Sequence, residues 1–275
     1  MLAQQPCVLI SFSRKKQIIM ITFLFLFVLV QQTLILVHSA GTFTSKTPAV
    51  YGIASTSTFA KKTNKVDGKL YIGGHSDGAV GAGAVGGYDM FIQKYPSDDP
   101  AQTPTWTKMF GTAGTDYLGD FKVDSSGNVY AAGMCTGTVN SVATKGSGDA
   151  CIFKLDSTGA VQCSAQYGGT GVDRFNGVDI DETNGYFYAV GNTTSATFDG
   201  TNTVGNAAGI WFRFQMSNCA QVGTKYVQNM PLATQTMHFG GVSVLSNVRI
   251  VFIFCSQYLI LFFTKPFFCT CRESV

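Results

Sequence analysis

Short apolar segments with strand-like patterns recur along this chain at a nearly constant spacing. The segments at 69–74, 128–133 and 186–191 each hold a tyrosine among apolar neighbours and end in glycine. Their tyrosines, at positions 71, 130 and 188, are 59 and 58 residues apart. Runs of four to seven β-branched and aromatic residues bounded by turn residues are typical of β-strands. The pattern therefore predicts a repeated unit with one such strand in each copy.

Three other patterns recur with a spacing near 60 residues. They are apolar segments that end in a basic residue, glycine-rich turns that end in aspartate, and short alternating segments. They lie at 89–94, 149–154 and 208–213; at 109–116 and 166–173; and at 119–124, 177–181 and 241–244. Repetition of several patterns at one period is the signature of a repeat architecture.

The connections between these strands have the composition of tight turns. Gly127 and Gly159 each follow an aspartate and two hydroxyl residues, so we expect a turn whose glycine takes a positive φ. In the third copy we expect Asn218 to occupy this place, because asparagine tolerates the left-handed conformation better than most residues.

A four-stranded unit cannot bury both faces alone, and such units stacked around an axis form a β-propeller. The segments GNVYAAG, GDACIFKLDSTG, AQYGGTGVD and GVDID closely resemble the SBBP (seven-bladed β-propeller) repeat, over roughly residues 66–247. The resemblance implies a secreted or S-layer-like cell-surface glycoprotein. It departs at Gly209–Trp211, where the family's acidic residue is missing, and in the longer connection between Tyr226 and Phe239.

The expected fold class is all-β, with β-propeller repeats of four antiparallel strands. We expect the repeat region to span 41–247, with units near 69–127, 128–185 and 186–247. This length supplies about three to three and a half blades, whereas closed propellers use typically ~4–8. We therefore expect an incomplete propeller, which either belongs to a longer chain or closes with a second subunit as a homo-oligomer.

Both ends of the chain differ from the repeat region. In residues 1–40 a basic segment at 14–16 precedes the apolar run 18–30, which is typical of a signal peptide; an uncleaved signal anchor is the alternative. Residues 248–275 form a hydrophobic tail that is short for a membrane span. This tail is interpreted as a membrane anchor, a strand followed by a frayed end, or a gene-model artefact. We therefore expect membrane attachment, if the protein has any, to use the N-terminal or the C-terminal hydrophobic segment.

Charge argues against nucleic acid as a partner. The chain is 13% charged, and its two ends hold six of its 19 basic residues but only one of its 16 acidic residues. The region 41–247 therefore carries a net charge of −2, with its lysines scattered. Nucleic-acid-binding proteins need a basic patch for phosphate contacts.

If the chain is exported, its cysteines can form disulfides and the single glycosylation sequon of the repeat region can carry a glycan. Cys135, Cys151, Cys163 and Cys219 are disulfide candidates; four cysteines allow three pairings, and the sequence does not choose among them. Asn192 begins the sequence Asn-Thr-Thr directly after a predicted strand, where we expect an exposed glycan acceptor.

No motif in the sequence predicts a catalytic residue, a cofactor or a metal. The Gly81–Gly86 segment matches G-x-G-x-x-G, but a predicted strand follows it instead of a helix, so we interpret it as a loop. Asp179–Gly185 misses the glycine and glutamate positions of a calcium loop. Asp116 and Asp173 recur at one offset, and we expect them to brace turns between blades.

The function expected from these observations is that of an exported, non-enzymatic scaffold that binds an extracellular protein or glycan. We expect binding at inter-strand loops such as 75–88 and 134–148, because loops on rigid scaffolds carry recognition. A propeller enzyme, either a lyase or a glycan hydrolase with its site at a channel mouth, is the alternative; a truncated, non-functional gene fragment is another. For the exported scaffold, we expect the protein to pass through the secretory pathway to the medium or the cell surface.

Overall fold

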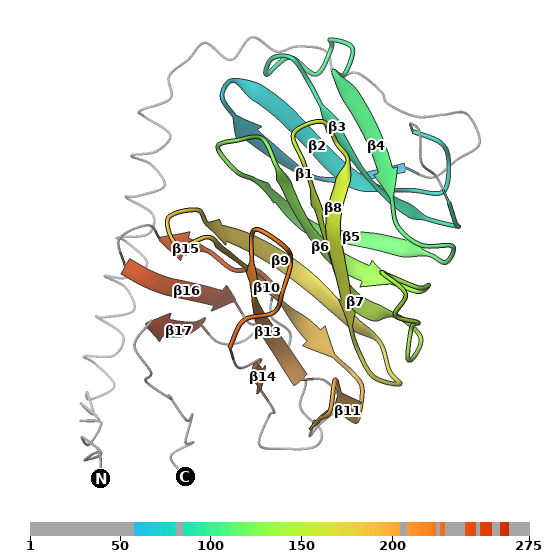
Figure 1. The fold of residues 1–275 in the computed structure, drawn as a ribbon, viewed down its shortest axis with the longest axis vertical. Coiled ribbons are helices and arrows are strands. Elements are labelled where there is room, and N and C mark those ends of the chain that lie inside the picture. The colour runs from blue at the N-terminus through green and yellow to red at the C-terminus, as the bar shows by residue number, and fades with distance from the viewer. Residues whose placement is uncertain are drawn as a thin grey trace, which may run out of the picture. The chain divides into compact units, whose positions relative to one another are not determined.

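The computed structural model describes residues 58–80, 85–203, 208–223, 226–228, 240–245, 248–254 and 259–263. These residues form β-strands joined by turns, with no helix among them (Figure 1). All of them belong to the second of the chain's two compact units, Ala49–Val275. Residues 1–40, for which the sequence predicts a signal peptide or signal anchor, lie outside the described residues.

Most strands belong to small antiparallel sheets whose neighbours in space are neighbours in sequence. Sheet 1 contains β1 (Thr58–Val66), β2 (Lys69–Ser76), β3 (Asp89–Lys94) and β4 (Trp106–Phe110). Sheet 2 contains β5 (Asp116–Val123), β6 (Val129–Cys135), β7 (Asp149–Leu155) and β8 (Val161–Tyr167). Sheet 3 contains β9 (Asp173–Asp181), β10 (Tyr186–Thr193), β13 (Ala208–Gln215) and β14 (Tyr226–Gln228). A small hairpin pairs β11 (Thr197–Phe198) with β12 (Thr201–Asn202).

The fold class is all-β, as predicted, and repeated four-stranded meanders that are not closed into a ring match an incomplete propeller. The sheets begin one strand earlier than the predicted units. The predicted unit 69–127 contains β5, yet β5 pairs with β6 and belongs to sheet 2. Sequence repeats define a period but not the strand at which a sheet begins, and this explains the difference.

Sheet 2 is buried on both faces. Val129 and Ala131 of β6 pack in a core cluster shared with sheet 1, whereas Tyr130 and Ala132 pack in a second cluster shared with sheet 3. Successive side chains of a strand point to opposite faces, so a strand with two buried faces is apolar throughout. The consecutive sheets therefore stack face to face.

The first strands of neighbouring sheets approach each other too closely for a side chain at certain glycines. A Cβ on Gly119 of β5 would lie 2.1 Å from the Phe175 carbonyl oxygen of β9. A Cβ on Gly177 would lie 2.7 Å from the Cα of Gly241. Glycine is the residue that permits this backbone contact, and it recurs in the sequence pattern for this reason.

The recurrent basic residues link each sheet to the next. Lys94 donates a hydrogen bond of 3.1 Å to the Ser157 carbonyl, and Lys154 donates one of 2.7 Å to the Met216 carbonyl. Each lysine therefore lies on the third strand of one sheet and binds the turn between the last two strands of the following sheet. The basic residue recurs in the repeat because each copy binds a carbonyl in the equivalent turn of the following sheet.

The turns follow the sequence expectation in two copies and differ in the third. Gly127 and Gly159 have positive φ values of 83° and 85°, which confirms the prediction. The expectation for Asn218 is wrong, because Cys219 adopts the left-handed conformation with φ of 60°. The third turn is one residue longer. The Asp156 amide donates to the Ala160 carbonyl, whereas the amide of the equivalent Gln215 donates to the Ala220 carbonyl.

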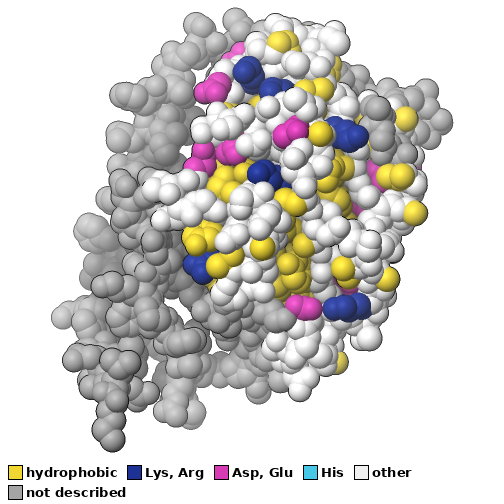
Figure 2. Space-filling view, viewed as in Figure 1, with side chains coloured by type: hydrophobic (Ala, Val, Ile, Leu, Met, Phe, Trp, Pro, Cys, Tyr) yellow, Lys and Arg dark blue, Asp and Glu magenta, His cyan; other side chains and the backbone are white. Residues whose placement is uncertain are grey.

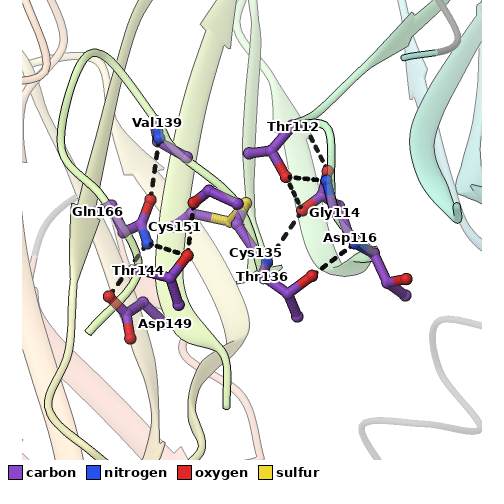
Figure 3. The surroundings of a disulfide bond; sticks show 12 residues. Thr112, Gly114, Asp116, Cys135, Thr136, Val139, Thr144, Asp149, Cys151 and Gln166 are labelled. Atoms are coloured by element: carbon purple, nitrogen blue, oxygen red, sulfur yellow. Dashed lines mark hydrogen bonds between the residues drawn. A yellow bond between two sulfur atoms is a disulfide. The ribbon is translucent and has the colours of Figure 1, made fainter. Parts of the chain in front are cut away.

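The described residues contain two disulfides, Cys135–Cys151 and Cys163–Cys219. The first joins neighbouring strands β6 and β7 within sheet 2 (Figure 3). The second joins β8, the last strand of sheet 2, to the turn after β13 in sheet 3, across 56 residues of sequence. One disulfide therefore reinforces a sheet and the other connects two sheets.

Asp116 and Asp173 brace turns, as expected. Asp116 accepts hydrogen bonds from the amide and hydroxyl of Thr112 and from the amide of Thr136 (Figure 3). Asp173 accepts bonds from the Gly169 amide, from the hydroxyl of Thr193 at the end of β10 and from the hydroxyl of Ser195, which follows β10. Each carboxylate thus ties the turn before its own strand to the loop that follows the next strand of the sheet.

Part of the hydrophobic tail continues the β-structure. Strands β16 (Val248–Phe254) and β17 (Leu259–Phe263) pair with each other, and β16 pairs with β15 (Val244–Leu245). Within the part of the chain that is described, no helix is long and apolar enough to cross a membrane. Residues 264–275 lie outside the described residues.

Candidate functional site

A pocket of about 210 Å³ lies where the first strands of sheets 2 and 3 meet. Residues of β5, β6 and β9 line it: Tyr117, Leu118, Gly119, Met134, Arg174, Phe175 and Asn176. The pocket lies at strand ends, and Met134 is its one lining residue from the predicted binding loops 75–88 and 134–148. We refer to it as the bulge pocket, because of the backbone feature that forms it.

Each first strand of sheets 1 to 3 contains a β-bulge at the same place. The register shifts between Ala60 and Lys62 in β1, between Leu118 and Asp120 in β5, and opposite the Val190–Gly191 step of β10 in β9. The extra residues in β5 and β9 are Gly119 and Asn176, and both line the pocket. A bulge bends the strand and re-aims its side chain, and such bulges often flank functional sites.

Asn192 supports the polar side of the bulge pocket. Its Oδ1 atom accepts hydrogen bonds from Asn176 Nδ2 at 3.0 Å and from Arg174 Nε at 3.3 Å. The expectation of an exposed glycan acceptor is wrong in its geometry, because Asn192 lies within strand β10 and is only 3% exposed. The sheet continues beyond the predicted strand end and buries the residue.

Tyr117 lines the pocket and packs against aromatic rings from the side of sheet 1. Tyr117 stacks on Tyr88, with ring centroids 5.6 Å apart and an interplanar angle of 26°. His75 contacts Tyr117 edge-on at 5.0 Å. Because two aromatic rings from the side of sheet 1 pack against Tyr117, they restrain its ring where it lines the pocket.

The pocket occupies a repeat position whose chemistry differs between copies. Asp116 and Asp173 are equivalent, so Tyr117 of β5 is equivalent to Arg174 of β9. Their partners on the neighbouring strands are Met134 and Asn192, respectively. Residues that hold the fold recur in the repeat, whereas these four do not. Departure from the repeat was the signal by which the sequence could have revealed Arg174 and Asn176, which our sequence analysis missed.

Arg174 brings a positive charge to the mouth of the bulge pocket. It is solvent-exposed, and it forms no ion pair with any described residue; the ion pairs there join Lys122 to Asp179 and Lys145 to Asp199. Nε is the one guanidinium nitrogen with a hydrogen bond to the described chain. Figure 2 shows the basic side chains of one face scattered singly among other residues, without a basic patch on that face.

Buried carboxylates form a second polar feature, at the junction of sheets 1 and 2. A Cβ on Gly111 would lie 2.3 Å from Asp116 Oδ2 and 2.8 Å from Asp89 Oδ1, so these two carboxylates lie close together. Burial raises the pKa of Asp116, and the charge of Asp89 raises it further, while the bonds from Thr112 and Thr136 oppose both. Asp89 Oδ1 is buried without a hydrogen bond.

Asp149 repeats this arrangement at the junction of sheets 2 and 3. Burial raises its pKa and the charge of Asp173 adds to the rise, against hydrogen bonds from Lys145 and Gln166. Its Oδ1 atom is buried without a hydrogen bond, like that of Asp89. In the third copy Ala208 replaces the aspartate, at the departure from the repeat noted in the sequence.

In the structure, the other two sequence motifs make contacts within the fold. Residues 81–84 of the glycine-rich segment lie outside the described residues, and Gly86 packs against the Gly114 carbonyl. In the aspartate-rich turn, Asp179 pairs with Lys122 and Asp181 accepts the bonds of Asn184. Among the described residues, no three His, Cys, Asp or Glu side chains gather in a way that could hold a metal ion.

Neither a protein-family model nor a curated protein matches the chain.

Proposed function

We propose that this protein is an exported scaffold of SBBP-type propeller repeats that binds an extracellular or cell-surface ligand. The observation that carries the proposal is the bulge pocket. It combines a charged group, an amide and an aromatic ring on a rigid apolar floor, at a repeat position whose residues are not those required by the fold. A concave, largely apolar site with a few convergent polar groups is the usual form of a ligand site.

The two disulfides support the exported location. Disulfides persist in secreted and cell-surface proteins, whereas the cytosol keeps most thiols reduced. The pairing also places Cys163–Cys219 between sheets, where it would hold the stack together outside the cell.

The chemistry of the pocket supports binding without catalysis. Glycan hydrolases act through a pair of carboxyl groups that flank the scissile bond. The bulge pocket is lined instead by one guanidinium, one amide, a tyrosine, a methionine and backbone. These groups orient a ligand, and none of them is a general base near neutral pH.

The test is to express the full chain with a C-terminal tag in secreting eukaryotic cells and to follow its location. We expect the protein in the medium or on the cell surface, and we expect the purified protein to bind a subset of an array of extracellular glycans and proteins. Tyr117→Ala should abolish this binding, whereas Tyr186→Ala, at the opposite end of sheet 3, should not. Retention inside the cell, or equal binding by wild type and Tyr117→Ala, would contradict the proposal.

A further inference from the structure

The bulge pocket presents a positive charge that the described chain does not neutralise. Arg174 has no acidic partner there, and a single hydrogen bond to Asn192 holds its Nε atom. A guanidinium carries five N–H donors, so the edge formed by its terminal nitrogens is available to a ligand. Such a fork matches the two oxygens of a carboxylate.

The size and walls of the pocket restrict the ligand further. Its volume of about 210 Å³ is below the ~300–1,000 Å³ of sites for drug-sized molecules, so it suits one ring-sized group. Tyr117, which stacks on Tyr88, offers an aromatic surface for the apolar side of a sugar ring, and Asn176, which donates to Asn192, lines the same pocket.

From this geometry we propose that the bulge pocket binds a carboxylate-bearing sugar, a hexuronate residue, whose carboxylate pairs with Arg174. The proposal rests on the binding function proposed above and names its ligand class. The carboxylate supplies the negative partner that Arg174 lacks among the described residues, and the sugar ring lies against Tyr117.

Asn192 acts as a positioning residue in this arrangement. It is 3% exposed and therefore does not reach the ligand, but its Oδ1 atom holds both Arg174 and Asn176. Since the amide is neutral, Asn192 orients the guanidinium without neutralising it. An aspartate here would keep the acceptor and cancel the charge.

The experiment titrates the secreted full chain with sodium glucuronate, glucose and sodium acetate, monitored by isothermal calorimetry. We expect glucuronate to bind more tightly than either of the others, and to weaken as NaCl is raised because salt screens the ion pair. Arg174→Ala should reduce glucuronate affinity by about 10-fold or more, the usual size of a charged hydrogen bond. Arg174→Lys should retain part of it. The matched control is Lys69→Ala, which removes an exposed charge from β2, outside the pocket lining.

Asn192→Asp distinguishes positioning from mere support of the fold. We expect this variant to keep its thermal unfolding temperature and its affinity for glucose, and to lose its preference for glucuronate over glucose. A structural role alone would change the affinity for both sugars together.

Three results would overturn the proposal, and they differ in what they mean for the proposed function. Equal affinity for glucose and glucuronate would remove the carboxylate from recognition but leave a binding scaffold. Binding of acetate as tight as that of glucuronate would identify a plain carboxylate site, such as one for a peptide end, and exclude the sugar. Absence of binding by all three compounds would overturn the hexuronate, while the array experiment tests the binding function independently.

Discussion

Two buried carboxylates, Asp116 and Asp149, contribute to the pH dependence of the stability of this protein. Asp116 is fully buried, and its three hydrogen bonds lower its pKa less than burial and the neighbouring Asp89 raise it. An acid whose pKa is raised on folding stabilises the folded state below its unfolded pKa, and this contribution is lost as pH rises through the folded pKa. Asp116 and Asp149 therefore make the free energy of unfolding fall as pH rises above about 4.

The variant Asp89→Asn tests this at Asp116. An asparagine can still accept the amide bonds of Val85 and Gly86 and can donate its NH₂ group toward Asp116, without a charge. We expect a shallower loss of unfolding free energy between pH 4 and pH 7, measured by urea denaturation at each pH. Asp67→Asn, at an exposed turn, serves as control and should follow wild type. A steeper pH dependence in Asp89→Asn would contradict the proximity of the two carboxylates.

Individual residues also show where sequence reasoning reaches its limit. The pattern predicted the positive φ of Gly127 and Gly159, because glycine in a turn has a local cause. It misplaced the third turn at Asn218, because the turn gains one residue and the Cys163–Cys219 disulfide lies at Cys219. Asn192 differs from its expected exposed position for a related reason: β10 continues to Thr193, and pairing with β9 depends on residues far away in the sequence.

At the scale of elements, the first strand of each sheet both stacks the sheets and forms the pocket. β5 and β9 touch through backbone at Gly119, and their bulges open the pocket beside this contact. Strand positions followed from alternating and apolar patterns in the sequence. The bulges did not, because a bulge is one extra residue relative to a partner strand, and the partner is known only from the pairing.

The strand contact predicts that Gly119→Ala is destabilising. Its Cβ would lie 2.1 Å from the Phe175 carbonyl oxygen, which belongs to a strand and has little freedom to move. We expect the free energy of unfolding to fall by about 1–3 kcal/mol, the range for overpacking. Gly241→Ala is the control, since no atom would lie within 4 Å of a Cβ at this position. Equal stability of the two variants would mean that sheets 2 and 3 are further apart.

The link between β8 and the turn after β13 predicts a second loss of stability. Cys163→Ala combined with Cys219→Ala opens a loop of 56 residues, and chain-entropy estimates give about 4 kcal/mol for such a loop. The pair Cys135→Ala and Cys151→Ala opens only 16 residues, for about 3 kcal/mol. Chemical denaturation of both double variants measures this order. No change on removal of Cys163–Cys219 would show that this disulfide does not form.

At the scale of the molecule, the sequence repeat accounts for the stacked sheets, and the residues that depart from the repeat line the bulge pocket. The period near 59 residues predicted repeated four-stranded sheets, and the interior of sheet 2, buried on both faces, shows how they pack. Lys94 and Lys154 recur because each binds the following sheet. Arg174 differs from its repeat equivalent, Tyr117, and the sequence shows this difference, but only the strand pairing shows that both residues line one pocket.

The most direct test of a stacked, exported repeat protein is disulfide mapping by mass spectrometry of the secreted, unreduced chain. We predict cross-linked peptides that join Cys135 to Cys151 and Cys163 to Cys219. The second link requires sheet 3 to lie beside the last strand of sheet 2, and both links require an oxidising compartment. Four free thiols, or a bond between Cys135 or Cys151 and either of the other two, would contradict the stacking of the sheets or the export of the chain.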